Sequence, residues 1–390
     1  MGQFADIRPY NDSEVPAVLN NLLADDDMIA AVASLKLGAW HKAFSWLVYP
    51  FIRRLLVRQF RGVNTVRGFQ DIIKKYMDDM VDSTTTGVTV SGLDDLDPNK
   101  SYLFMSNHRD IALDPAFVNY ALYHNNHDTV RIAIGDNLLT KPYVSDLMRI
   151  NKSFIVKRSE KGPRQILAAY KMLSAYIRHS IEEDNTPIWI AQREGRAKDG
   201  NDRTEPAIIK MLAMSRKQKA ENFADYINKL HIVPVAISYE LDPCDGAKAQ
   251  ELYETATYGR YEKTEHEDVD SIAKGISGNK GNVHVSFGTP VVGGFEEADA
   301  VARAIDQQVV NNYVLHSSNF FAYKMLHGEY PQGEHSVDHR AFFITGLESR
   351  EKMFQARINA LPKEHRGYAL GIYANTIDQK KQYSIFRQAL

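Results

Sequence analysis

The stretch Tyr102-Leu-Phe-Met-Ser-Asn-His-Arg-Asp-Ile-Ala-Leu-Asp-Pro115 decides the fold of this chain. Its first part, Tyr102 to Met105, is an apolar run typical of a short buried strand. Pro115 suits the first turn of a helix, with Asp114 just before it as the expected N-cap. A strand that leads through polar residues into a helix is typical of α/β domains, whose ligands bind beyond the carboxyl ends of the strands. The polar turn is therefore a candidate site.

The turn contains His108, followed by Asp110 and Asp114. An imidazole can take up a proton near neutral pH, and a neighbouring carboxylate can fix its tautomer and stabilise the imidazolium. A loop histidine beside an aspartate is also a common hydrogen-bonded pair on protein surfaces. The turn by itself leaves both interpretations open.

Strands and helices alternate along the chain from Gly87 onward. The expected strands cover 87–91, 102–105, 130–134, 153–156, 188–191, 232–238 and 283–287. Helical patterns cover 115–124, 142–149, 163–183, 205–214 and 218–229. This order predicts an α/β fold with a mostly parallel sheet flanked by helices. Residues 245–280 are charged and show no clear apolar period, so we expect a segment outside the sheet that contains one helix. Helical patterns continue from 296 toward the C-terminus.

The segment before the sheet has a different pattern. Residues 1–30 are acidic and irregular, whereas apolar residues recur at three- and four-residue spacing over 35–82, with Pro50 expected to bend or split the helix. Aromatic residues mix there with four arginines, Arg53, Arg54, Arg58 and Arg61. One interpretation is a core-packing helix with a solvated basic edge. The other is an interfacial helix that lays its aromatic face on a bilayer and its arginines on anionic headgroups.

These patterns predict three parts of the chain. An N-terminal helical segment, membrane-contacting in the second interpretation, covers 1–84. An α/β domain covers 85–292, and a helical C-terminal extension covers 293–390.

Composition excludes several classes of protein. Of the 390 residues, 44% are hydrophobic and 25% are charged, so the chain can form a sizeable core. The net charge of −2 argues against a nucleic-acid binder that works through bulk positive charge. The single cysteine, Cys244, excludes an intrachain disulfide framework and a cysteine metal cluster, and it fits a reducing compartment.

The sequence predicts neither a secretion signal nor a membrane-spanning helix. The N-terminus lacks a basic head followed by an apolar core. The longest charge-free apolar run, Ala43 to Ile52, is far shorter than the roughly 20 residues that a membrane-spanning helix needs. We therefore expect a cytoplasmic protein that is soluble or rests on a membrane surface.

Charged residues also follow two other expected strands. Lys157, Arg158 and Ser159 follow strand 153–156, where a solvated strand end is an equally good explanation. After strand 188–191 comes Gln192-Arg-Glu-Gly-Arg-Ala-Lys-Asp-Gly200, in which glycines let the backbone approach a ligand and guanidinium groups suit phosphate. This second block favours a functional role over a simple turn.

In this order and spacing, four blocks resemble the glycerolipid acyltransferases, the glycerol-3-phosphate and 1-acylglycerol-3-phosphate (lysophosphatidic acid) acyltransferases of phospholipid synthesis. Asn107-His108-Arg109 is similar to the family's first block, and Phe154 to Arg158 to its second. Glu194-Gly195-Arg196 is similar to the third block and Val233-Pro234-Val235 to the fourth. The resemblance covers about residues 85–290 and implies that the α/β domain is an acyltransferase domain.

The chain departs from the family pattern at two places. The family usually has four residues between its His and Asp, whereas five separate His108 from Asp114. Either Asp114 or Asp110 then orients the imidazole, and the position of Asp114 before Pro115 favours Asp114. The third block has Arg193 where the family usually has proline.

The resemblance implies an O-acyltransferase that moves a fatty acyl group from acyl-CoA or acyl carrier protein to a glycerol-phosphate hydroxyl. His108 would be the general base, and no cofactor beyond the acyl donor is implied. The implied substrate-binding residues are Arg109, Lys157, Arg158, Glu194, Gly195, Arg196 and Lys198. Lys157, Arg158, Arg196 and Lys198 would bind phosphate, and Glu194 would bind a glycerol hydroxyl or brace an arginine. A lipid product implies peripheral association with the cytoplasmic face of a membrane.

Rival interpretations remain at this point. One is an acyltransferase of the same superfamily with another hydroxyl or amine lipid as acceptor, and another is a non-catalytic protein that binds lipid or acyl carrier. No Gly-x-Ser-x-Gly elbow is present, so direct transfer is expected. His335 and His339 have the spacing of a helical metal pair but lack a nearby Glu or Cys to complete a site, and no metal is expected.

Overall fold

The structure is a computed structural model that describes residues 2–37, 44–217, 220–264, 267–331 and 346–388. The chain forms two compact units. The smaller unit comprises residues 1–79 and 130–179, and the larger unit comprises residues 80–129 and 180–390.

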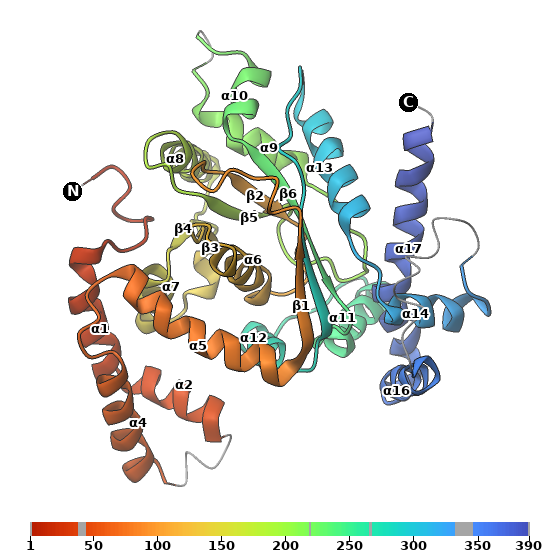
Figure 1. Cartoon of the computed structure of the whole chain (residues 1–390), viewed down its shortest axis with the longest axis horizontal. Helices are drawn as coiled ribbons and strands as arrows, with labels where there is room; N and C mark the ends of the chain where they lie inside the picture. Colours follow the sequence, from red (N-terminus) through yellow and green to blue (C-terminus); the bar gives the residue numbers. More distant parts are fainter. Residues whose placement is uncertain (1, 38–43, 218–219, 265–266, 332–345, 389–390) are drawn as a thin grey trace. The chain divides into compact units, whose positions relative to one another are not determined.

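Five strands of the larger unit lie side by side in the order β1, β7, β6, β2 and β5 (Figure 1). Their bounds are β1 Thr85–Ser91, β2 Leu103–Ser106, β5 Ile188–Ala191, β6 Ile232–Tyr239 and β7 Gly281–Phe287. Neighbours are parallel except β6 and β7, which are antiparallel. Both β2 and β6 are buried over their whole length, which explains their unbroken apolar runs. The predicted mostly parallel sheet flanked by helices is confirmed.

Helices of the larger unit cover the sheet and extend to the C-terminal end of the described chain. They are α6 Leu113–His124, α9 Pro206–Leu212, α10 Phe223–Lys229, α11 Asp245–Tyr258, α12 Glu267–Ser277, α13 Ala298–Asn312, α14 Ser317–His327, α16 Leu347–Asn359 and α17 Arg366–Gln388. Helix α13 packs on β6, and α17 packs on α14 and α11.

The expectation of one helix within 245–280 is wrong, because α11 and α12 both form there. Gly259 ends α11 in the left-handed conformation, with φ of 76°. The buried positions of helix α12 are the small residues Ser271 and Gly275, so no large apolar side chain marks its inner face in the sequence. A Cβ at position 275 would collide with the carboxylate of Asp110, so glycine is needed for this approach.

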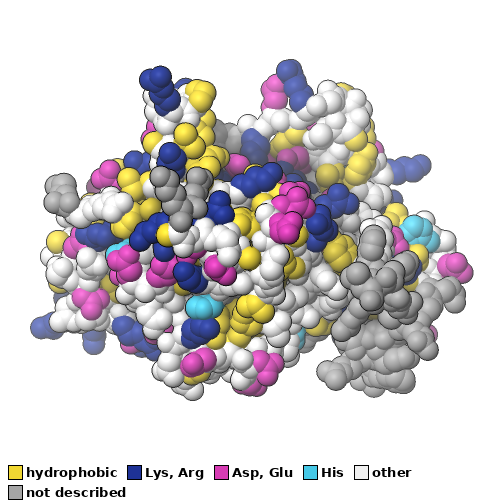
Figure 2. Space-filling model, turned by 90° about the horizontal axis from the view of Figure 1, so that it is seen from above, with side chains coloured by type: hydrophobic (Ala, Val, Ile, Leu, Met, Phe, Trp, Pro, Cys, Tyr) yellow, Lys and Arg dark blue, Asp and Glu magenta, His cyan; other side chains and the backbone are white. Residues whose placement is uncertain are grey.

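The surface agrees with the near-neutral balance of charge. On the face drawn in Figure 2, Lys and Arg side chains alternate with Asp and Glu, and apolar patches lie between them.

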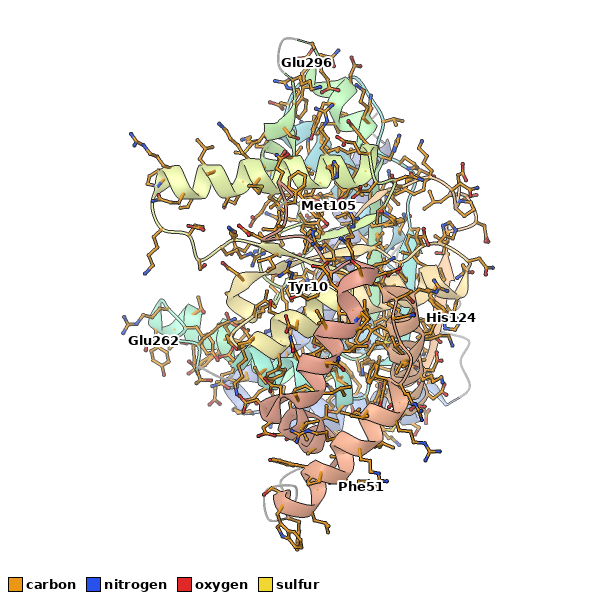
Figure 3. The ribbon with its side chains drawn as sticks, turned by 90° about the vertical axis from the view of Figure 1, so that its left-hand side faces the viewer. Tyr10, Phe51, Met105, His124, Glu262 and Glu296 are labelled. Atoms are coloured by element: carbon orange, nitrogen blue, oxygen red, sulfur yellow. The ribbon has the colours of Figure 1, made fainter. Side chains whose placement is uncertain are left out.

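In the residues that the structure describes, the smaller unit combines two parallel strands with six α-helices or parts of them. The strands are β3 Arg131–Gly135 and β4 Ser153–Val156. The helices are α1 Val15–Ala24, α2 Asp26–Leu37, α4 Ser45–Gln59, the first residues of α5 Val66–Thr84, α7 Pro142–Ile150 and most of α8 Pro163–Glu182. Tyr10, labelled in Figure 3, fixes the N-terminal segment on α7: its hydroxyl donates to Asp146 at 2.6 Å, and the Arg149 guanidinium lies 4.4 Å from its ring centroid.

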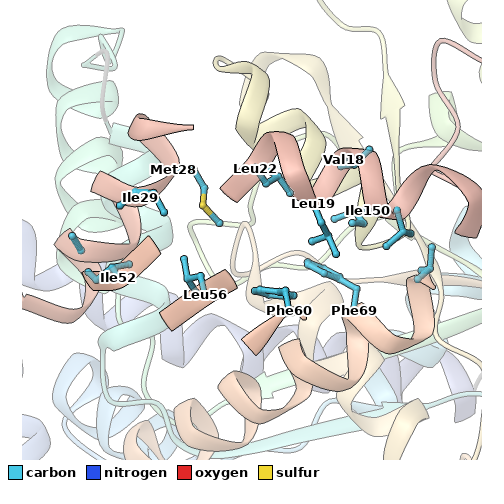
Figure 4. Packing of buried hydrophobic residues seen from close by; sticks show 13 residues of the cluster. Val18, Leu19, Leu22, Met28, Ile29, Ile52, Leu56, Phe60, Phe69 and Ile150 are labelled. Atoms are coloured by element: carbon cyan, nitrogen blue, oxygen red, sulfur yellow. The ribbon is translucent and has the colours of Figure 1, made fainter. Parts of the chain in front are cut away.

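The expectation that residues 1–30 are irregular is wrong. Helix α1 and the start of α2 lie there, because Val15, Val18, Leu19 and Leu22 form a buried apolar face that the acidic neighbours obscure in the sequence. That face belongs to a core shared by α1, α2, α4, α5 and α7 (Figure 4). Phe60 and Phe69 stack within it with their ring centroids 5.6 Å apart.

None of the helices in the described ranges is both long enough and apolar enough to cross a membrane. The division of the chain at residues 84 and 292 stays a prediction, because the two compact units follow a different criterion.

The carboxylate of Asp306 on α13 generates a prediction about stability and pH. It accepts a hydrogen bond from the backbone N–H of Thr204 at 2.7 Å, and burial, with the nearby charge of Asp202, raises the pKa of Asp306 to about 6. The pKa in an unfolded chain is about 3.9. The carboxyl group of Asp306 therefore binds its proton more tightly in the folded state than in the unfolded state. Its contribution to stability is lost as the pH rises from about 4 through 6.

We expect Asp306→Asn to remove this loss, because the amide oxygen can still accept from Thr204 and carries no charge. Between about pH 4.5 and 7.5, the free energy of unfolding of the variant should gain about 2 kcal/mol relative to the wild type. Chemical denaturation of both proteins at the two pH values measures this difference. A difference that is the same at both pH values would contradict the assignment.

Candidate active site

Strand β2 ends where a side chain takes over the pairing with β6. The backbone N–H of Asn107 donates to Val235 O at 3.3 Å, and its side-chain amide then pairs with both backbone groups of Ile237. The amide oxygen accepts from Ile237 N at 2.8 Å and the amide nitrogen donates to Ile237 O at 3.1 Å. Asn107 thus closes the ladder and frees the next residues to turn.

Asp110 starts the following helix. Its carboxylate accepts from the backbone N–H groups of Ala112 at 3.0 Å and Leu113 at 2.8 Å, which are donors at the beginning of α6. Burial, together with the charge of Asp114, raises the pKa of Asp110. The expectation that Asp114 is the N-cap is wrong, because α6 begins at Leu113 and Asp114 lies within its first turn.

Asp114 is fully buried and accepts hydrogen bonds on both of its oxygens. Its Oδ2 lies 2.9 Å from His108 Nδ1, and it accepts from the backbone N–H groups of Arg109 at 2.6 Å and Asp110 at 2.9 Å. Its Oδ1 accepts from the hydroxyl of Tyr239 at 2.7 Å. Burial and then the charge of Asp114 raise the pKa of Tyr239 well above its ordinary value, so this hydroxyl stays protonated and donates.

This arrangement fixes the tautomer of His108. A carboxylate only accepts, so Nδ1 carries the proton of a neutral imidazole and Nε2 is left as the basic nitrogen. Within the described residues Nε2 has no hydrogen-bond partner, and the side chain is 14% exposed. The ring also contacts the edge of Trp189, at 5.9 Å between centroids. Of the two aspartates that the sequence left as alternatives, Asp114 is the one that contacts the imidazole.

The loop after β5 lies against this turn. The backbone N–H of Ala197 donates to His108 O at 2.7 Å. Gly195 has a positive φ of 73°, and both Glu194 and Gly195 are exposed. Arg196 is half-buried, with Nη2 3.5 Å from Ser271 Oγ. Lys198 forms an ion pair with Glu251.

Arg109 has a different environment from the one its position suggests. Its guanidinium is buried, pairs with Asp202 at 2.7 Å and donates to Gly200 O at 3.0 Å. The ring of Tyr313 lies 5.3 Å from it, and Lys248 donates to the backbone oxygen of Arg109 at 2.7 Å. A guanidinium held in this way supports the turn and is not open to solvent.

Lys157 and Arg158 follow β4 in the smaller unit, whereas the other candidate residues belong to the larger unit. The carboxylate of Asp136, which follows β3, accepts from the backbone N–H groups of Arg158 at 3.0 Å and Ser159 at 3.1 Å. Burial acts to raise the pKa of Asp136, but the hydrogen bonds from Ser159 and Arg158 lower it overall. These contacts fix the backbone from which both cations project.

The structure also bears on the possibilities of a metal site and of a cysteine nucleophile. In the part of the chain that the structure describes, no group of three His, Cys, Asp or Glu residues could hold a metal ion. His335 and His339 lie outside the described residues. The thiol of Cys244 is buried and donates to Ser271 O at 3.5 Å, and burial raises the pKa of Cys244, so it is a poor nucleophile.

The sequence missed several residues that build the site. Tyr239 stands at the end of the predicted fourth-block strand, so its position was visible although its partner was not. Asn107 belongs to the first block and was not given a role. Asp202, Lys248 and Gln379 offered no local signal, because their partners are distant in the sequence.

Comparison with known proteins gives a family match for part of the chain. Residues 87–238 match the family model described as Acyltransferase. A search of the curated proteins finds no match to the chain. One solved structure, the 1-acyl-sn-glycerophosphate (LPA) acyltransferase PlsC from Thermotoga maritima, is 12% identical over 76% of this chain and 94% of that chain, with a TM-score of 0.36. At that TM-score the likeness to this structure carries no argument.

Proposed function

We propose that this chain makes a glycerolipid ester in phospholipid synthesis, because residues 87–238 match the family model described as Acyltransferase. It transfers a fatty acyl group from acyl-CoA or acyl carrier protein to a hydroxyl of glycerol-3-phosphate or lysophosphatidic acid. The observation that carries this proposal is the contact of 2.9 Å between His108 Nδ1 and the buried carboxylate of Asp114.

His108 acts as the general base. Its Nε2 takes the proton of the acceptor hydroxyl as the hydroxyl oxygen attacks the thioester carbonyl. The carboxylate of Asp114 stabilises the imidazolium that forms. When the tetrahedral intermediate collapses, the carbon–sulfur bond breaks, and the departing thiolate takes the proton back from His108. The new carbon–oxygen bond is the ester of the product.

Direct transfer, without an acyl-enzyme, is favoured by the state of the nearest thiol. Cys244 is buried and hydrogen bonded, and its pKa is raised by burial, so little thiolate is present to attack a thioester. The acceptor hydroxyl is therefore the nucleophile in this proposal.

The acceptor phosphate binds to cations near the turn. Arg196 is the first candidate, because it belongs to the loop whose Ala197 donates to His108 O. Lys198 is already paired with Glu251, so its role is to shape the loop or to exchange partners on binding. Glu194 and Gly195 are exposed and bind the glycerol part. A phosphate-binding role for Lys157 and Arg158 of the smaller unit stays a prediction from the sequence.

The lipid product and one exposed surface support peripheral association with the cytoplasmic face of a membrane. Helix α4 buries Ile52 and Leu56 in the core of the smaller unit. Its other faces expose Trp46 at 76%, Leu47 at 58% and Phe51 at 68%, together with Arg54, Arg58 and Arg61 next to the helix end. Figure 3 labels Phe51 on this helix. Exposed aromatic side chains beside arginines suit the boundary between acyl chains and anionic headgroups.

The first test is acyl transfer measured by mass spectrometry of lipid products. Palmitoyl-CoA and palmitoyl acyl carrier protein serve as donors, with glycerol-3-phosphate and lysophosphatidic acid supplied separately as acceptors. We expect product with one of the two acceptors. His108→Ala should lower the rate on the order of a hundredfold or more, as expected for loss of a general base.

In the same assay Arg196→Ala should raise the KM for the acceptor and leave kcat nearly unchanged.

The same assay can reject the proposal. Full activity of His108→Ala would show that the base lies elsewhere. No transfer to either acceptor by the wild type, together with transfer to a lipid that lacks phosphate, would identify a different acceptor class. Binding of the donor without any turnover would favour a non-catalytic role.

The membrane proposal has its own test by vesicle flotation. At low salt the wild type should float with vesicles that contain anionic phospholipid, and binding should weaken as salt is added. Trp46→Ser with Phe51→Ser should reduce the floating fraction severalfold. The matched control is Val292→Ser with Met353→Ser, which replaces two exposed apolar side chains of the larger unit. A wild type that stays in the aqueous fraction, or equal losses in both double variants, would count against α4 as the contact.

A further inference from the structure

The C-terminal helix α17 contacts the loop that carries Arg196. Asn375 Nδ2 donates to Asp199 O at 2.8 Å, and Thr376 Oγ1 lies 3.3 Å from Gly200 O. Gly200 has a positive φ of 83°, and a Cβ there would collide with the backbone oxygen of Ile372. The backbone of the loop therefore lies directly against the backbone of the helix.

Gln379 makes the most specific of these contacts. Its side-chain oxygen accepts from the backbone N–H of Asp202 at 3.0 Å, and its side-chain nitrogen donates to the backbone oxygen of Asp202 at 2.6 Å. Gln379 is 5% exposed. One amide that pairs with both backbone groups of a single residue fixes that residue in position and in orientation.

The side chain of Asp202 continues the connection to the catalytic turn. Its Oδ2 accepts from Asn107 Nδ2 at 3.1 Å and from Arg109 Nη2 at 2.7 Å. Asn107 and Arg109 are the residues directly before and after His108. The loop also reaches His108 through the N–H of Ala197. A continuous set of buried hydrogen bonds therefore links α17, the Arg196 loop and the side chains of Asn107 and Arg109, which flank His108.

Helix α17 is itself firmly held in the larger unit. Its buried residues Ala369, Leu370, Tyr373 and Ala374 belong to a hydrophobic core with α14 and α16. The hydroxyl of Tyr373 donates to Asp245 at 2.8 Å, and Asn319 donates to Tyr373 O at 2.8 Å. Apolar packing alone would hold the helix in place. The polar side chains that face the loop are additional to that packing, and losing one would leave buried partners unpaired.

We propose that α17 is part of the acyl-transfer site and that Gln379 is a positioning residue within it. Gln379 fixes Asp202, and Asp202 fixes the turn that carries His108 and the loop that carries Arg196. This inference rests on the proposed function for the roles of His108 and Arg196. The physical link between the helix and the two segments is independent of those roles.

The test compares Gln379→Met with Gln382→Met in the full-length chain. Methionine matches glutamine in length but makes neither hydrogen bond. Gln382 is exposed on the same helix and serves as the matched control. Hydrogen–deuterium exchange and steady-state kinetics are measured on both variants and on the wild type, with palmitoyl-CoA as donor and the preferred glycerol phosphate as acceptor.

In Gln379→Met, peptides that cover 107–110 and 194–202 should exchange severalfold faster, while peptides of β7 stay unchanged. The KM for the acceptor should rise about fivefold to tenfold, the effect of one to two hydrogen bonds, with the KM for the donor unchanged. Gln382→Met should match the wild type in hydrogen–deuterium exchange, in the KM for the acceptor and in the KM for the donor. If Gln379→Met does not fold, Asn375→Ala replaces it in the test. Asn375 is half-buried, so this variant should show a weaker change in the same direction.

Other outcomes are distinguishable. Faster exchange over the whole larger unit, with a lower apparent kcat and both KM values unchanged, would overturn the inference, because it would show a purely structural role. Faster exchange at 194–202 but not at 107–110 would also overturn it, because it would break the link to His108. Faster exchange at both segments in a protein that transfers no acyl group would support the link and reject only the proposed function.

Discussion

The site depends on the hydrogen bonds that the carboxylate of Asp114 accepts. One buried side chain receives the imidazole of His108, two backbone N–H groups of the turn and the hydroxyl of Tyr239 at the end of β6. These contacts join the end of one strand to the start of α6 and to the neighbouring strand. The same contacts leave Nε2 of His108 as the basic nitrogen. Folding of the turn and its chemistry therefore share a single group.

Around this group the larger unit builds a rigid frame from distant parts of the chain. Asn107 completes the pairing of β2 with β6, and Asp202 holds the residues on both sides of His108. Lys248 supports the turn from α11 through the backbone oxygen of Arg109. Gln379 fixes Asp202 from the last described helix. Each contact is buried, so water competes little and each lost partner is costly.

The sequence predicted the strand–helix turn, the parallel sheet and the pairing of His108 with an aspartate, because these depend on local apolar runs and on residue type. It left Asp110 and Asp114 as alternatives, because their roles depend on where α6 begins. The family resemblance implied a substrate-binding role for Arg109, yet its guanidinium pairs with Asp202, which lies 93 residues away. Gln379 lies 177 residues from Asp202. The spacing of residues along the chain carries no information on such distant pairs. A single glutamine within a helix likewise gives no sequence signal that would reveal its partner.

The central claim is that His108 and Asp114 work as one unit in acyl transfer. The most direct test is a double-mutant cycle of kcat/KM with His108→Ala, Asp114→Asn and the double variant, each first shown to be folded. Without the imidazole the carboxylate has nothing to orient, so the double variant should lose no more activity than His108→Ala alone. Losses that multiply, with the double variant far below either single variant, would show that the two residues act separately and would contradict this account.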